Sequence, residues 1–379
     1  MIKVLVVDDS ALVRKLFGRV LSEDTGFEVA LARNGLEALA LLEQFKPDVV
    51  TLDVQMPQMN GLECLDRIMV QRPCPVVMVA STTAEGAEAT LSALKLGAVD
   101  FVPKPTGAVS LSIDEFAPTF LEKIRAAASA KLPASRRLRE RVQFRAGGAA
   151  SSVRLQKAGP EPAESAVDDA LEVAQGEGLV LVGTSTGGPP ALEALLLPLP
   201  ASFPWPILVA QHMPASFTGS LAKRLDGICS INVIEVRQPT LLQVGCAYIG
   251  RGDADIVVSK RASSLVAMTV PINPSYPWHP STDRLVRSAM EHLPPAQLIG
   301  ILMTGMGDDG AKAMTELRLK GGRTIAEAEE TAVIWGMPGE LVRAAGATWT
   351  LPLPRIAQKL KRLMPDHAAH PQTDRSPRA

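Results

Sequence analysis

Over the first 126 residues, strand-like and helix-like segments alternate at regular intervals. Short runs rich in β-branched residues, each typical of a buried strand, recur at Ile2–Val7, Val29–Ala32, Val49–Leu52, Val76–Val79 and Val99–Val102. Between these runs, apolar residues recur every three or four positions, which is the period of an amphipathic helix. Five strands that alternate with helices predict a parallel sheet covered by helices on both faces. Ligands of such sheets bind beyond the carboxyl ends of the strands.

Length and composition argue against several other classes of protein. A chain of 379 residues predicts two or three domains. The net charge of −1 gives no support for binding nucleic acid or an anionic membrane. No apolar run approaches the roughly 20 residues that span a bilayer, and the N-terminal segment does not have the pattern of a signal peptide. Four widely spaced cysteines are typical of reduced thiols, so we expect a cytoplasmic protein that does not insert into membranes.

Charged residues follow three of the predicted strands of this first unit. Asp8 and Asp9 end the first strand, Asp53 ends the third, and Lys104 follows the fifth. Carboxylates that meet at one edge of a sheet repel each other and need a cation, and all-oxygen ligands suit Mg²⁺. A lysine beside them suits a phosphoryl group carried by one of the carboxylates. The alternative is that Asp8 and Asp9 only cap the following helix.

The motifs VVDDS and TLDVQMPQMNG, with the Lys-Pro pair after the fifth strand, resemble a two-component receiver domain over residues 1–126. The resemblance implies a flavodoxin-like (βα)5 fold that a histidine kinase phosphorylates. It further implies that Asp53 is the phosphoacceptor and that Lys104 pairs with the phosphate. The implied cofactor of phosphorylation is Mg²⁺, held by Asp9, Asp53 and the Gln55 carbonyl, with Asp8 assisting.

One position of this unit departs from the receiver pattern. Receivers usually have Thr or Ser at the end of the fourth strand to bond the phosphoryl group, but this sequence has Ala80, with Ser81 next. We therefore expect the phosphorylation chemistry to persist, and either the switch that follows it to be altered or Ser81 to supply the missing hydroxyl. Phe101 occupies the place of the family's aromatic switch residue.

The rest of the chain separates into a linker, a second α/β unit and a tail. Residues 127–176 are dominated by Ala, Ser, Arg, Pro and Gly, which predicts a flexible linker. Residues 177–364 again alternate strand-like and helix-like segments, and their strand-rich middle, 229–270, predicts hairpins that decorate the sheet. The polar segment 365–379 predicts a disordered tail.

The second unit opens with a strand-like run followed by GTSTGG, Gly183 to Gly188. A strand, a tight glycine turn and a helix N-terminus would expose Ser185 where backbone N–H groups and a helix dipole stabilise negative charge. One interpretation is a nucleophilic serine. The other is a glycine loop that cradles a nucleotide phosphate. The motif by itself does not decide between them.

Two further strand ends of this unit carry a candidate base and a candidate acid. Of the five histidines, His212 directly follows the run Ile207–Ala210, which places it on the same sheet edge as Ser185. A third strand-like run leads into TGMGDDG, where Asp308 or Asp309 can accept from a histidine ring or only cap the next helix. Ser, His and Asp on one edge suit a nucleophile, a base and an orienting carboxylate. Their order along the chain differs from that of α/β-hydrolases.

The motifs GTSTGG, QHMPASFTGSLAKRL, TGMGDDG and WGMPG together resemble the catalytic domain of CheB, the family of chemotaxis protein-glutamate methylesterases, across the second unit. A receiver ahead of such a domain matches the architecture of that family. The resemblance implies a Rossmann-like doubly wound α/β fold, with Ser185 as nucleophile, His212 as base and Asp309 as orienting acid. It implies the Met306 backbone N–H as an oxyanion donor and Thr186 as part of the site.

The resemblance also implies the reaction and its partners. Glutamate γ-methyl esters on the cytoplasmic helices of chemoreceptors would be hydrolysed to glutamate and methanol through an acyl-enzyme, and receptor glutamines would be deamidated. No cofactor is implied for this hydrolysis, and a receiver docked over the Ser185 edge would regulate it through phosphorylation at Asp53. Two alternatives remain open at this point. The esterase acts on another methylated protein, or a non-enzymatic module holds a nucleotide on GTSTGG.

The second unit departs from the family pattern at three places. Asp308 stands where many members have Asn, beside the predicted triad acid. The segment YIGRG, with Asp255 after it, replaces Tyr-Ile-Ala-Pro-Gly with a later His. Trp278 and His279 replace His-Arg ahead of a Pro-Ser pair. We expect the last two segments to border the substrate cleft.

Overall fold

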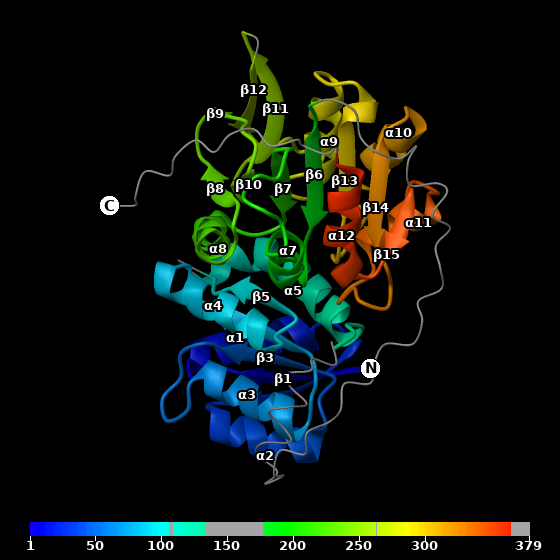
Figure 1. Cartoon of the computed structure of the whole chain (residues 1–379). Helices are drawn as coiled ribbons and strands as arrows, with labels where there is room; N and C mark the ends of the chain where they lie inside the picture. Colours follow the sequence, from blue (N-terminus) through cyan, green and yellow to red (C-terminus); the bar gives the residue numbers. More distant parts are fainter. Residues whose placement is uncertain (106–108, 133–176, 263, 365–379) are drawn as a thin grey trace, which may run out of the picture.

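The structure is a computed structural model, and it describes residues 1–105, 109–132, 177–262 and 264–364 (Figure 1). The predicted linker, 127–176, lies outside the described residues from position 133 onward. The predicted tail, 365–379, lies wholly outside them. No helix in the described ranges combines the length and the apolar character needed to cross a bilayer.

The N-terminal domain is built on a five-stranded parallel sheet in the order β2-β1-β3-β4-β5, as the alternating pattern predicted. Its strands are β1 (Ile2–Val7), β2 (Phe27–Ala32), β3 (Val49–Asp53), β4 (Val76–Ala80) and β5 (Asp100–Pro103). Its helices are α1 (Ala11–Ser22), α2 (Gly35–Phe45), α3 (Gly61–Gln71), α4 (Ala84–Leu96) and α5 (Val109–Ala128).

Helices cover both faces of this sheet, because its strands are apolar on both sides. Successive strand residues point to opposite faces. In β1, Leu5 and Val7 pack with α2, α3 and α4, whereas Val4 and Val6 pack with α1 and α5.

Four of the helices begin at a polar residue that follows a strand or loop. The side chains of Ser10, Asn34, Asn60 and Thr83 each accept the backbone N–H three residues further on, at the start of α1, α2, α3 and α4. Such caps satisfy N–H groups that would otherwise lack a partner in the first turn. The carboxyl ends of the strands are therefore followed at once by a turn and a new helix.

The C-terminal domain is built on a seven-stranded parallel sheet in the order β15-β14-β13-β6-β7-β10-β8. Its strands are β6 (Leu179–Thr184), β7 (Ile207–Gln211), β8 (Asn232–Val236), β10 (Cys246–Gly250), β13 (Leu298–Leu302), β14 (Arg323–Glu327) and β15 (Trp349–Leu351). Its helices are α7 (Gly188–Leu196), α8 (Ala215–Ile228), α9 (Thr282–Met290), η2 (Pro295–Gln297), α10 (Ala311–Leu319), α11 (Met337–Arg343) and α12 (Leu353–Leu363).

The strand-rich middle of this domain is divided between two sheets. The strands β11 (Asp255–Arg261) and β12 (Ser264–Val270) form the expected antiparallel hairpin, and the short strand β9 (Thr240–Leu241) pairs with β12. The strands β8 and β10, however, pair in parallel and extend the main sheet rather than forming a hairpin on it. The chain between them, from Arg237 to Gly245, includes β9 and is longer than a tight hairpin turn.

The sheet order places three strands side by side at the centre of the C-terminal domain. The strand β6 lies between β13 and β7. The helices α7, α8 and α12 share one hydrophobic cluster with one face of the sheet, and α9, α10 and α11 share another with the opposite face. The residues that follow β6, β7 and β13 therefore meet at one edge, between helices of both layers.

The two domains pack directly against each other (Figure 1). Helix α4 of the N-terminal domain contacts α7 and α8 of the C-terminal domain. Beside these helices, the ring of Phe101 in β5 lies 4.4 Å from that of Phe217 in α8. The carboxyl edge of the first sheet is thereby brought toward the carboxyl edge of the second.

Candidate active site

Ser185 lies in the sharp turn between β6 and α7. Its backbone N–H donates to the Thr304 carbonyl at 3.0 Å, and its own carbonyl accepts the Gln211 side-chain amide at 3.0 Å. Gly187 has a φ of 77°, a conformation that favours glycine in this turn. A Cβ on Gly305 would lie 2.7 Å from the Ser185 Cβ, so the neighbouring loop can approach the turn only because it lacks a side chain there.

His212, immediately after β7, is bonded to Asp309 in the turn between β13 and α10. The distance from His212 Nε2 to Asp309 Oδ2 is 2.8 Å, and both side chains are buried. The other ring nitrogen, Nδ1, is buried and has no hydrogen-bond partner among the described residues. Ser185 and His212 line the same cleft. The histidine therefore has one nitrogen fixed by a carboxylate and one free for a hydroxyl in that cleft.

The carboxylate of Asp309 is held by the N-terminus of α9. Its Oδ2 accepts the Thr282 N–H at 2.6 Å, and its Oδ1 accepts the Asp283 N–H at 3.1 Å and the Ser281 hydroxyl at 3.0 Å. Burial by itself raises the pKa of Asp309, but His212 and these backbone donors outweigh that effect, so the pKa lies below its ordinary value. Asp309 is thus an ionised acceptor that orients His212.

Asp308 takes no part in this arrangement. Its side chain is 51% exposed and forms an ion pair with Lys312 at 3.4 Å, one turn along α10. The negative charge of Asp308, next to Asp309 in the sequence, therefore faces solvent and is paired with Lys312. Of the two neighbouring acids, only Asp309 contacts His212.

A cleft of about 560 Å³ surrounds Ser185 and His212 and is lined by both domains. The C-terminal domain contributes Met306, Trp278 and His279, and the N-terminal domain contributes Phe101 and Lys104 among others. The Trp278 ring lies parallel to that of His212, with centroids 5.6 Å apart and planes at 11°. The expectation that the segment around Trp278 borders the cleft is confirmed.

Thr186 makes a direct contact with the N-terminal domain. Its hydroxyl donates to Asp100 Oδ2 at 2.5 Å, and both side chains are buried. The other oxygen of Asp100 accepts the Lys123 ammonium at 2.9 Å and the Phe101 N–H at 2.7 Å. The turn after β6 in the C-terminal domain is thus bonded to β5 of the N-terminal domain, through the residue that follows Ser185.

The acidic cluster predicted at the edge of the first sheet is formed. Carboxylate oxygens of Asp8, Asp9 and Asp53 all lie within 4.8 Å of one another. Lys104 Nζ lies 2.7 Å from Asp53 Oδ2 and 3.3 Å from Asp8 Oδ2. Burial raises the pKa of Asp53 to about 6 and also raises that of Asp8. Apart from its ion pair with Lys104, the buried Asp8 Oδ2 has no hydrogen-bond partner among the described residues.

The remaining predicted residues of the N-terminal domain lie around this cluster. The backbone N–H of Gln55 donates to Asp53 Oδ1 at 3.3 Å. Ala80 is fully buried, and the hydroxyl of Ser81 lies 3.0 Å from that of Thr83, the residue that caps α4. Phe101 is buried in the domain interface, with Lys123 Nζ 5.3 Å from its ring centre.

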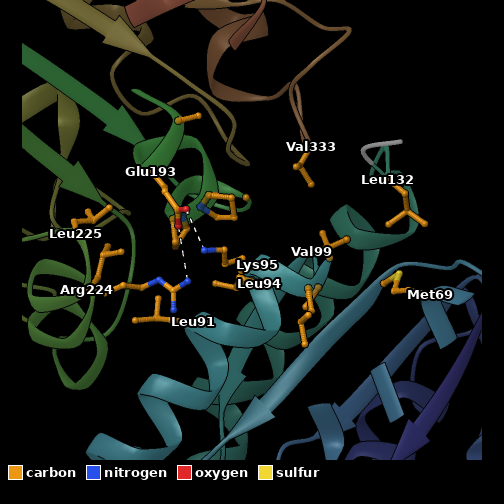
Figure 2. Close-up of a pocket in the computed structure, with 18 of the residues that line it drawn as sticks. Met69, Leu91, Leu94, Lys95, Val99, Leu132, Glu193, Arg224, Leu225 and Val333 are labelled. Atoms are coloured by element: carbon orange, nitrogen blue, oxygen red, sulfur yellow. Dashed lines mark ion pairs between the residues drawn. The ribbon is translucent and has the colours of Figure 1, made fainter. Parts of the chain in front are cut away.

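A second, mostly apolar cavity of about 360 Å³ lies between the domains (Figure 2). Its walls include Leu91 and Leu94 of α4 and Leu225 of α8. Glu193 of α7 lies between two cations, 3.4 Å from Lys95 Nζ and 3.8 Å from Arg224 Nη2. The Lys95 pair crosses the domain interface and is exposed on the lysine side.

Several residues of the site could not be identified from the sequence. Asp100 precedes the expected aromatic residue, but nothing in its surroundings indicates a partner in the other domain. Gln211, next to His212, donates its amide to the carbonyls of Ser185 and His212, and its position in the motif QHMP was the only signal. Two of the donors to Asp309 are the backbone N–H groups of Thr282 and Asp283, which leave no trace in residue type.

Both domains match known families. A model of the CheB methylesterase family matches residues 180–360, and a model of the response regulator receiver domain matches residues 4–112. A protein of Rhodopseudomonas palustris, named protein-glutamate methylesterase/protein-glutamine glutaminase 2, is 56% identical over 94% of this chain and 96% of its own. A protein of Rhodospirillum rubrum, with the same name numbered 3, is 51% identical over 96% of each chain.

Among solved structures, the catalytic domain of the Thermotoga maritima CheB methylesterase is 34% identical, with a TM-score of 0.48, over 50% of this chain and 100% of that one. The similarity to the two relatives extends over nearly the whole length of each of them and over both domains of this chain. The chain belongs to the CheB methylesterase family, with a receiver domain ahead of the methylesterase domain.

Proposed function

We propose that this chain is a phosphorylation-regulated protein-glutamate methylesterase that also deamidates glutamine. The observation that carries the proposal is the pair His212–Asp309, with the free Nδ1 of His212 in the cleft that Ser185 lines. The names of the two relatives support the choice of both activities. In this proposal the receiver domain comprises residues 1–126 and the methylesterase domain residues 177–364.

In the proposed mechanism, His212 Nδ1 takes the Ser185 hydroxyl proton as the serine oxygen attacks the side-chain carbonyl of the substrate. Asp309 keeps the proton of the ring on Nε2, so that Nδ1 is the base. The tetrahedral oxyanion is held by backbone donors, with the Met306 N–H proposed as one of them. Each such donor typically contributes about 2.7–4 kcal/mol to transition-state stabilisation.

The acyl-enzyme then forms as the leaving group departs. His212 returns its proton to the methoxy group, and methanol leaves, or to the amide nitrogen, and ammonia leaves. Water activated by His212 hydrolyses the acyl-enzyme to glutamate. Every step uses only residues of the chain and water, so we propose that hydrolysis needs no cofactor.

We propose that the receiver domain controls access to Ser185. The support is its position, because the cleft around Ser185 and His212 is lined on one side by receiver residues. Asp53 is the proposed phosphoacceptor, with Lys104 as the partner of the phosphate. A phosphoryl group on Asp53 adds about −1.5 to −2 charges at the carboxyl edge of the receiver sheet. Phe101 and Lys104, at the same edge, line the cleft between the domains. Phe101 and Ser81 are the proposed switch residues.

The acidic cluster of the receiver fits a divalent cation. Asp8, Asp9 and Asp53 bring hard oxygen ligands together, and Asp8 Oδ2 among them has only the ion pair with Lys104. Mg²⁺ would be held by these carboxylates and by the Gln55 carbonyl. It would neutralise the charge of the incoming phosphoryl group, while Lys104 orients it.

The proposed partners follow from the substrate and the receiver. The substrate is a glutamate methyl ester or a glutamine on a cytoplasmic helix of a methyl-accepting chemoreceptor, and the phosphodonor is a chemotaxis histidine kinase. We propose a cytoplasmic protein, because the buried Cys64, Cys74 and Cys246 are free thiols, which are typical of a reducing compartment.

The rival hypothesis of a nucleotide-binding module has less support. The carboxylate of Asp100 lies against Thr186, at the crest of the GTSTGG turn, where a phosphate would need positive charge. An esterase that acts on another methylated protein keeps the same triad and differs only in its partner.

The test is methanol release from a methylated chemoreceptor by the phosphorylated full-length protein and by its Ser185→Ala variant. Ser185→Ala should abolish release while Asp53 phosphorylation and the melting temperature stay unchanged. Release by the variant at the rate of the natural protein would refute the serine mechanism. Release from a different methylated protein, but not from a chemoreceptor, would favour the other esterase.

A further inference from the structure

Two residues at which the sequence departs from its family are bonded to each other in the catalytic domain. His279 Nδ1 lies 2.9 Å from Asp255 Oδ1. Asp255 is fully buried, and it also accepts the Arg284 guanidinium at 2.7 Å and the Ser281 N–H at 2.7 Å. The two departures are therefore one structural unit.

The buried carboxylate fixes the tautomer of His279. Asp255, ion-paired with Arg284, can only accept, so the ring proton of a neutral His279 lies on Nδ1. The lone pair is then on Nε2. The ring lines the cleft that contains Ser185, and its side chain is 18% exposed. Because Nδ1 is bonded to the buried Asp255, the ring nitrogen that remains for a ligand in the cleft is Nε2, which is an acceptor.

The backbone around His279 is held on both sides. The preceding residue, Trp278, stacks on His212, the proposed proton donor to the leaving group. Two residues further on, the Ser281 hydroxyl donates to Asp309. His279 Nε2 thus lies on the same segment as Trp278, whose ring covers the proposed base His212.

The cleft offers few polar side chains from the catalytic domain. Among its described lining residues these are Ser185, His212, Trp278 and His279. The first two are used by the proposed mechanism, and an indole N–H can only donate. His279 is therefore the side-chain acceptor in this wall that has no assigned partner.

We propose that His279 Nε2 accepts an N–H of the substrate carboxamide, and that His279 determines specificity for glutamine deamidation. The inference rests on the proposed function. A glutamine side chain carries two N–H groups beside the carbonyl that Ser185 attacks, whereas a methyl ester carries none. An acceptor in the wall of the cleft that contains Ser185 favours the amide, because otherwise a buried N–H of the substrate would lack a partner.

The test compares the two reactions in the same protein. The substrate is one chemoreceptor segment that carries either a glutamate methyl ester or a glutamine at the same position. The full-length protein, phosphorylated with acetyl phosphate and Mg²⁺, is assayed for methanol and for ammonia. The variant is His279→Asn, whose amide can still donate to Asp255 but does not extend to the Nε2 position. The matched control is His292→Asn, which makes the same change in a histidine outside the cleft.

The expected result is that His279→Asn lowers kcat/KM for ammonia release by roughly 3- to 10-fold, as loss of one neutral hydrogen bond predicts. Methanol release should change by less than about twofold, and His292→Asn should change neither rate. Equal loss of both reactions would mean that His279 is structural or binds the substrate backbone, and no change in the ratio would overturn the proposal. A natural protein that releases methanol but no ammonia would also overturn it. Absence of methanol release from the natural protein would instead refute the proposed function itself.

Discussion

The hydroxyl of Thr186 in the methylesterase domain donates to the carboxylate of Asp100 in the receiver domain at 2.5 Å. Thr186 directly follows the proposed nucleophile Ser185, and Asp100 directly precedes Phe101, whose ring packs on Phe217. The turn that carries the nucleophile and the receiver strand that carries the aromatic residue are therefore in direct contact. A movement of β5 cannot leave the surroundings of Ser185 unchanged.

Loss of this bond should release the methylesterase domain from the receiver. A hydrogen bond to a charged group contributes about 1.5–3 kcal/mol, so Asp100→Ala should raise methanol release by the unphosphorylated protein roughly tenfold or more. The measurement is the basal rate on a methylated chemoreceptor. Lys95→Ala is the control, because the interdomain Lys95–Glu193 pair is exposed on the lysine side and such pairs contribute about 0–1 kcal/mol. A basal rate of Asp100→Ala equal to that of the natural protein would mean that the bond does not restrain the domains.

The two neighbouring acids of TGMGDDG should differ sharply in their effect on the rate. Asp309→Asn removes the charge that orients His212 and should lower kcat by about 10⁴-fold, as loss of the carboxylate does in comparable triads. Asp308→Asn removes only an exposed charge paired with Lys312 and should leave kcat within about twofold. Initial rates of methanol release by the two variants decide the assignment, and it is wrong if Asp308→Asn is the slower enzyme.

Asp309 should also make the stability of the protein depend on acid pH. Its pKa is lower in the folded chain than its ordinary value of 3.8, so it stabilises the fold above about pH 4. This contribution is lost as the pH falls below 3.8 through the lowered pKa. Urea unfolding at several values between pH 6 and pH 3 should show that the difference in stability between the natural protein and Asp309→Asn shrinks on acidification. A difference that stays constant would indicate an unperturbed pKa.

The alternating pattern predicted the order of strands and helices along the N-terminal domain, and it placed the candidate triad residues directly after apolar runs. The reason is that parallel strands end at one edge, so a polar residue after an apolar run can be located without any structure. Ser185, His212 and Asp309 follow β6, β7 and β13, which are neighbours in the sheet. The pattern of residues does not show that β6, β7 and β13 are neighbours in the sheet. Only the family resemblance indicated this before the structure.

Two long-range contacts, one between the domains and one within the catalytic domain, could not be predicted. The pairs Asp100–Thr186 and Asp255–His279 join residues far apart in the chain, and neither leaves a local pattern. The middle of the catalytic domain was partly misjudged for a similar reason. Period and turn residues indicate strands but not their direction, and β8 and β10 pair in parallel within the main sheet.

Removal of divalent cations should separate the two chemistries of the protein. Within the described ranges, the cluster of three acids suited to a cation lies in the receiver, at Asp8, Asp9 and Asp53. EDTA should therefore prevent phosphorylation by acetyl phosphate, measured by intact mass, and leave the basal rate of methanol release unchanged. A fall of the basal rate in EDTA that added Mg²⁺ restores would show that hydrolysis itself needs a metal.

The most direct test of the account is the rate of methanol release from one methylated chemoreceptor before and after phosphorylation by acetyl phosphate and Mg²⁺. The comparison uses the full-length protein and Asp53→Asn, with phosphorylation of each verified by intact mass. Phosphorylation should raise the rate of the natural protein, and Asp53→Asn should stay at the basal rate. Equal rates of the natural protein with and without the phosphoryl group on Asp53 would contradict control of the Ser185 cleft by the receiver.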